Sequence, residues 1–127
     1  MNRRCNPFDY AAARYDAWFE SQEGRVLFAQ EVECLRRVVS PTTGRWIEIG
    51  VGTGRFAEAL GVTDGVEPSA PMRALAQRRC VRTVAAVGER LPYADRVFDG
   101  VLMATTLCFL DDPAKSLKEC RRVLKNA

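Results

Sequence analysis

Gly50, Gly52 and Gly54 stand at alternate positions directly after the apolar segment WIEI. A glycine-rich turn between a strand and a helix lets the backbone come close to a ligand, because no Cβ intervenes. Dinucleotide sites use such a turn to seat a pyrophosphate on the N-terminus of the following helix. The pattern predicts a ligand site, and the residues beside the glycines indicate whether that ligand is a phosphate.

Two of those residues argue against a pyrophosphate. The dinucleotide pattern is G-x-G-x-x-G, but this chain reads G-x-G-x-G and carries Arg55 where the third glycine would stand. Glu48 lies just before the loop, where an acid repels a phosphate and attracts an ammonium group. The pattern therefore favours a ligand with a positive charge, and a purely structural glycine turn is the alternative.

Alternating strand and helix patterns position these residues. We expect short apolar strands at 45–50, 64–68, 81–87 and 97–105, and helices at 55–60, at 69–80 and from Asp112 onward. Apolar strands between helices predict a parallel sheet covered on both faces. The predicted fold class is α/β with a doubly wound, mostly parallel sheet. Such sheets bind ligands beyond the C-terminal ends of their strands, where the glycine loop lies.

The segments that flank this core also carry patterns. An aromatic-rich stretch at 7–23 contains Tyr15, with Trp18 and Phe19 expected in the core. A helix follows, with one apolar face and Pro41 as its stop. That face consists of Phe28, Val32, Leu35 and Val39. The last helix is expected to bury a face made of Ala114, Leu117, Cys120 and Leu124.

Composition limits the remaining classes. The chain has 127 residues, a formal net charge of +3 and 47% hydrophobic residues, which suits one domain without a dense basic surface for nucleic acid. Five cysteines without C-x-x-C spacing predict reduced, mostly buried thiols in a cytoplasmic protein. Since the chain has no histidine, a His-based triad or a His-bearing zinc site is excluded, and we expect no bound metal. No apolar run is long enough to cross a membrane.

Four segments resemble a known family in order along the chain. The segment IEIGVGTG closely resembles the first motif of class I S-adenosylmethionine-dependent methyltransferases of the type 11 kind. The segments GVEPS, GERLPYADRVFDGVL and TTLCFLDDPAKSLKECRRVLK resemble the parts that follow. The resemblance runs from about Asp9 to the last residue. It implies one Rossmann-like domain, 1–127, with an N-terminal helical cap at 1–40 and an α/β core at 44–127 that lacks the family's C-terminal strands.

The resemblance also implies a cofactor, S-adenosyl-L-methionine, which leaves as S-adenosyl-L-homocysteine. Glu67 would bind the ribose hydroxyls, Gly88 and Glu89 would border the adenine, and Thr105 would border the methionine portion. Val87 departs from the family, which often has an acidic or polar residue there. The implied cofactor residues are Tyr15, Glu48, Gly50, Gly52, Gly54, Glu67, Pro68, Met72, Gly88, Glu89 and Thr105.

The implied activity is methyl transfer to an unidentified small-molecule acceptor, with no catalytic residue assigned. Two alternatives remain: a non-catalytic domain that binds S-adenosylmethionine as a partner or regulatory unit, and an NAD-dependent oxidoreductase, which Arg55 disfavours. The fourth strand, about 98–104, would have an exposed outer edge in this chain. Exposed edges template pairing, so we expect a homodimer through it unless the last helix covers it.

Overall fold

The computed structural model describes residues 6–39 and 42–126. Cys5, one of the five cysteines, and Pro41, the predicted stop of the second helix, lie outside the described residues. The elements in order are α1 (Phe8–Trp18), α2 (Gln22–Val39), β1 (Trp46–Ile49), α3 (Arg55–Leu60), β2 (Asp64–Val66), α4 (Ala70–Arg78), β3 (Arg82–Val84), β4 (Gly100–Leu102), the 3-10 turn η1 (Leu107–Phe109) and α5 (Pro113–Val123).

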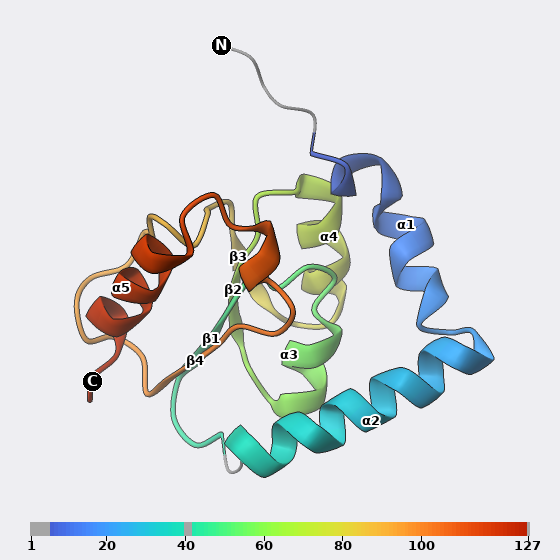
Figure 1. The fold of residues 1–127 in the computed structure, drawn as a ribbon, viewed down its shortest axis with the longest axis horizontal. Coiled ribbons are helices and arrows are strands. Elements are labelled where there is room, and N and C mark those ends of the chain that lie inside the picture. Colours follow the sequence, from blue (N-terminus) through green and yellow to red (C-terminus); the bar gives the residue numbers. More distant parts are fainter. Residues whose placement is uncertain (1–5, 40–41, 127) are drawn as a thin grey trace.

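The four strands form one parallel sheet in the order β3-β2-β1-β4. Figure 1 shows α5 on one face of this sheet and α3 and α4 on the other. The predicted doubly wound α/β fold is confirmed. β1 lies inside the sheet with β2 and β4 as neighbours, so the loop after β1 opens where the order of the strands reverses.

Each face of the sheet has its own core. Ile47 and Ile49 of β1 are fully buried and pack with Phe98 and Val123 on the α5 face. On the other face, Val51 packs with residues of α2, α3 and α4. Because side chains alternate along a strand, Glu48 faces the α3 side, opposite to its isoleucine neighbours. This alternation aims an acid toward the helix that follows the glycine loop.

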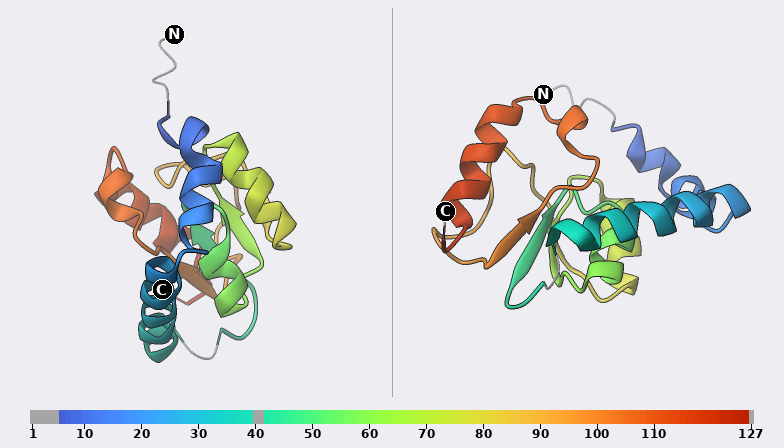
Figure 2. Two further views of the ribbon diagram at one scale, coloured as in Figure 1. Left: turned by 90° about the vertical axis from the view of Figure 1, so that its right-hand side faces the viewer. Right: turned by 60° about the horizontal axis from the view of Figure 1, so that its bottom comes forward.

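The two helices before the sheet cover its α3–α4 side. α1 packs beside α4 and α2 beside α3, as the views in Figure 2 show. Val32 is buried, and Phe28, Leu35 and Val39 pack against the same core, which confirms the predicted face of α2. α1 therefore lies on the same face of the sheet as α3, the helix that follows the glycine loop.

Several expectations about burial were wrong. In α5 the buried residues are Ser116, Cys120 and Val123, and Leu117 is 55% exposed. The small Ser116 side chain faces inward, where the backbone of Gly88 lies close to it. A Cβ added to Gly88 would clash with Ser116 Oγ, so a small side chain suits position 116. Phe19 is buried as expected, but Trp18 is 43% exposed.

The cysteines and the strand lengths also differ from expectation. Cys34, Cys80 and Cys108 are exposed and only Cys120 of the described cysteines is buried, so the prediction of mostly buried thiols was wrong. β3 and β4 are shorter than predicted, since their ends pass into loops. Among the described residues, no helix combines the length and apolar character needed to span a membrane.

Candidate functional site

The glycine loop joins β1 to α3 with a backbone that turns through the left-handed region. The φ angles are +69° at Gly50, +55° at Gly52 and +83° at Gly54. The amides of Gly50 and Val51 both donate to Val66 O, at 2.9 and 3.0 Å, which fixes the loop to the end of β2. A Cβ on Gly52 would meet nothing within 4 Å, whereas one on Gly54 would lie 2.9 Å from the backbone of Ala76. Gly52 thus faces open space and Gly54 packs against α4.

The open space beside Gly52 is a cavity of about 480 Å³ at the C-terminal ends of the strands. That volume is in the range of small-molecule sites. The structure brings ten of the residues implied by the family resemblance to its wall: Tyr15, Glu48, Gly50, Gly52, Glu67, Pro68, Met72, Gly88, Glu89 and Thr105. Gly54 belongs to the packing behind the loop instead.

Glu48 is the most unusual side chain in the cavity wall. It is 1% exposed, and its carboxyl accepts a hydrogen bond from the backbone of Ala57. Its other oxygen, Oε2, has no hydrogen-bond partner among the described residues. Burial, with a smaller contribution from the Glu67 charge, raises the pKa of Glu48 well above its usual range. A buried acceptor without a partner is costly, and a cationic or hydrogen-donating ligand group would relieve that cost.

Glu67 links the end of β2 to the glycine loop. Its Oε2 accepts from Gly52 N at 3.1 Å and its Oε1 from Ser69 N at 3.0 Å. Burial raises the pKa of Glu67, although both hydrogen bonds act in the opposite direction. A carboxylate has about four lone-pair sites, so each oxygen can still accept a bond from a ligand hydroxyl.

The rest of the wall is less polar. Met72 is 2% exposed, Gly88 is buried and Val87 is 47% exposed, and all three line the cavity. The segment after β4 closes the cavity near the glycine loop, because Thr106 Oγ1 donates to Ala104 O at 3.1 Å and lies 3.4 Å from Gly50 O. Thr105 sits in that segment with a φ of +56°.

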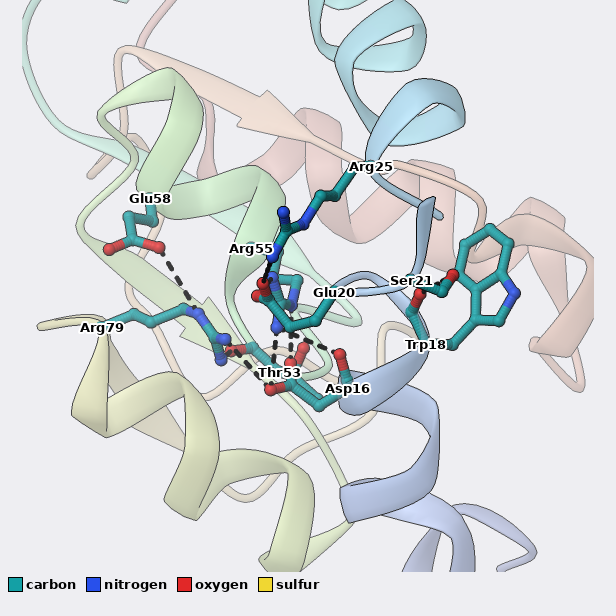
Figure 3. Close-up of polar contacts among 9 residues, drawn as sticks. All are labelled: Asp16, Trp18, Glu20, Ser21, Arg25, Thr53, Arg55, Glu58 and Arg79. Carbon is teal, nitrogen blue, oxygen red and sulfur yellow. Dashed lines mark hydrogen bonds and ion pairs between the residues drawn. The ribbon is translucent and has the colours of Figure 1, made fainter. Parts of the chain in front are cut away.

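An ionic cluster that the sequence did not reveal connects α1 to the loop. Arg55 donates from Nε to Asp16 Oδ1 at 2.8 Å and from Nη2 to Asp16 Oδ2 at 3.1 Å. Arg79, at the end of α4, donates to the same Asp16 at 3.0 Å, and Glu20 accepts from Arg55 Nη1 at 2.8 Å (Figure 3). Asp16 is 39 positions from Arg55, so no local pattern could have paired them.

The α1 wall of the cavity is aromatic. Tyr15 and Phe8 are edge to face, with 6.2 Å between ring centroids, and Phe8 packs in the same way on Phe109 of η1 at 5.3 Å. Burial raises the pKa of the Tyr15 hydroxyl, and the charges of Glu31 and Glu48 add to the effect. Tyr15 is therefore neutral near pH 7 and is a poor general base.

Comparison with known proteins identifies the family to which this chain belongs. The model of the family described as "Methyltransferase domain" matches residues 47–127, which span the glycine loop and the whole sheet. The chain belongs to the class I S-adenosylmethionine-dependent methyltransferases. The matched residues of this methyltransferase domain include the glycine loop at the end of β1.

The relatives are longer than this methyltransferase domain. Rv2003c, an uncharacterized protein of Mycobacterium tuberculosis, is 50% identical over 113 residues, which are 89% of this chain and 40% of that protein. A demethylmenaquinone methyltransferase of Thermotoga maritima is 31% identical over 132 residues, covering 93% of this chain and 55% of its own length. The chain thus spans about half, or less, of the curated relatives it matches.

A solved structure shows the same architecture. An S-adenosylmethionine-dependent methyltransferase of Thermotoga maritima, described as a possible histamine N-methyltransferase, has a TM-score of 0.85 and 42% identity. The match covers 93% of this chain and 55% of that one.

Proposed function

We propose that this chain binds S-adenosylmethionine in the cavity and transfers its methyl group to a small-molecule acceptor. The observation that carries the proposal is Glu48, a buried acid of the cavity wall near the open face of Gly52, whose Oε2 has no hydrogen-bond partner among the described residues. The cofactor contains an ammonium group, which suits this acid. It contains no phosphate, so the acid does not face a pyrophosphate.

The chain's own residues would hold the cofactor along the wall. Glu67 is positioned to accept from two ribose hydroxyls, and Met72 offers an apolar surface for the adenine ring. Gly52 leaves room for the methionine portion. When bound, the cofactor supplies an electrophilic methyl group on sulfur, and the protein supplies position and electrostatics.

A small acceptor is supported by the cavity and by the relatives. The cavity of about 480 Å³ lies between α1, η1 and the glycine loop. The names of two relatives refer to demethylmenaquinone and histamine, which are both small molecules. We keep the cytoplasmic location as a prediction that rests on the free cysteines.

Calorimetric titration with S-adenosylhomocysteine and, separately, with NAD tests the cofactor. We expect S-adenosylhomocysteine to bind and NAD not to bind, because Arg55 fills the third-glycine position and Glu48 would repel a pyrophosphate. A panel of small acceptors with radiolabelled S-adenosylmethionine then separates an enzyme from a non-catalytic binding domain. Binding of NAD alone would overturn the proposal.

A further inference from the structure

One wall of the cavity is aromatic and comes from α1 and η1. Of its residues, Tyr15 is also implied for the cofactor by the family resemblance, whereas Phe8 and Phe109 are not. We call Phe8, Tyr15 and Phe109 the aromatic wall. Phe109 is 67% exposed even though its ring packs on Phe8, so a ring face is left for a ligand to cover.

Among the described residues, four carboxyl groups and one guanidinium line the cavity. Of the described residues that line it, Arg55 is the cationic one, and all three of its guanidinium nitrogens donate to Asp16 or Glu20. Carboxyl groups line the cavity as well: Glu48, Glu67, Glu89 and Asp111. Burial raises the pKa of Tyr15, and the nearby acids Glu31, Glu48, Asp16 and Glu67 raise it further. An anionic ligand would therefore meet repulsion without a free cationic partner.

We propose that the aromatic wall is the acceptor subsite and that it takes a small aromatic molecule without a negative charge. The inference rests on the proposed function, because it places the acceptor next to the cofactor in one continuous cavity. Edge-to-face and stacked contacts with Phe8 and Phe109 would hold the ring. A cationic substituent would gain further from the ring faces and the carboxylates.

Four probes separate the ring from the charge. The same ring carries a positive substituent in 2-phenylethylamine, a neutral one in 2-phenylethanol and a negative one in phenylacetate, while 2-cyclohexylethylamine keeps the amine and loses the aromatic ring. Each is titrated into the chain saturated with S-adenosylhomocysteine, with saturation-transfer NMR as readout. We expect 2-phenylethylamine and 2-phenylethanol to bind at least about five-fold more tightly than phenylacetate and 2-cyclohexylethylamine.

Two variants locate the subsite. Phe109→Ala should lower the affinity for 2-phenylethylamine about five-fold, because the substitution removes a ring of the aromatic wall. The affinity for S-adenosylhomocysteine should change less than about two-fold, because the Phe109 side chain is mostly exposed. Leu117→Ala, on the outer face of α5 and 55% exposed, is the control and should change neither. Equal binding of phenylacetate, or an unchanged affinity in Phe109→Ala, overturns the acceptor proposal alone. Absence of S-adenosylhomocysteine binding overturns the proposed function and this inference together.

Discussion

Asp16 and Arg55 form a two-pronged ion pair between α1 and the first residue of α3. The contacts are 2.8 Å and 3.1 Å long, and the two side chains are 15% and 13% exposed. A bidentate pair fixes direction as well as distance. Since α1 and the residue after it, Phe19, bring aromatic rings to the cavity wall, this pair sets the position of that wall relative to the glycine loop.

The first prediction concerns Asp16→Asn. Burial disfavours the Asp16 charge, but hydrogen bonds from Arg55, Thr53 and Arg79 outweigh it and lower its pKa from 3.8 to about 2. A depressed pKa means stability that is present above pH 4 and lost as the pH falls through about 2. We expect Asp16→Asn to lower the free energy of unfolding by about 2 kcal/mol at pH 7.

Denaturant unfolding at several pH values measures this change. The difference between the wild type and Asp16→Asn should shrink as the pH approaches 2. Glu20→Gln is the control, because Glu20 is 58% exposed and an exposed pair contributes little. A difference that stays constant from neutral to acidic pH would show that the Asp16 charge is not what stabilises α1.

The sequence alone predicted the part of the site that is local in the chain. The glycine loop, Glu48 and Glu67 follow from the spacing of residues at strand ends, and the sheet follows from apolar periodicity. The Asp16–Arg55 pair could not be predicted in this way, because it joins residues 39 positions apart whose types suit any solvated helix face. The exposure of Leu117 was missed because a small residue, Ser116, was needed against Gly88.

A second prediction contrasts two glycines with the same backbone requirement. Gly52→Ala and Gly54→Ala both place a side chain at positive φ, a strain of about 1–2 kcal/mol. Only the Cβ at position 54 also meets the backbone of Ala76, at 2.9 Å. We expect Gly54→Ala to lower the melting temperature more, and Gly52→Ala to weaken S-adenosylhomocysteine binding more. The reverse order would place the ligand away from Gly52.

A third prediction concerns Glu67→Ala. The substitution removes the acceptor of Gly52 N and Ser69 N and the proposed acceptor of the ribose hydroxyls. We expect S-adenosylhomocysteine binding to weaken by about 1–3 kcal/mol in calorimetry. Glu33→Ala is the matched control, since Glu33 is exposed and pairs with Arg37 on α2. Unchanged affinity in Glu67→Ala would place the ribose elsewhere.

A fourth prediction concerns self-association. Among the described residues, β4 pairs with β1 in the sheet. Ahead of β4, Phe98 forms an isolated parallel bridge with Leu124, and Lys125 N donates to Phe98 O at 2.9 Å, but no such pairing is described for the outer edge of Gly100–Leu102. α5 packs on a face of the sheet through Cys120 and Val123. We expect two copies to pair along this edge, as free strand edges do. Sedimentation over micromolar concentrations checks it, and a single 14.2 kDa species throughout would contradict it.

The last prediction uses the raised pKa of Glu48. Because burial keeps the carboxyl protonated in the folded protein, a rise in pH above 4.5, the ordinary pKa of a glutamate, ionises Glu48 in the unfolded chain first, and folding stability falls. A ligand ammonium next to the carboxyl favours the ionised form, so ligand binding should release a proton. We therefore expect S-adenosylhomocysteine affinity to rise as the pH increases above 4.5, for as long as Glu48 is still protonated in the free protein.

Calorimetry in two buffers with different ionisation enthalpies counts the released proton directly. Glu48→Gln should abolish the release and flatten the pH dependence, and its amide oxygen can still accept from the Ala57 backbone. Glu67 also has a raised pKa, so Glu67→Gln measured in parallel assigns the proton to one acid or the other. Proton uptake on binding, or release that persists in Glu48→Gln, would mean that the ammonium group does not meet Glu48.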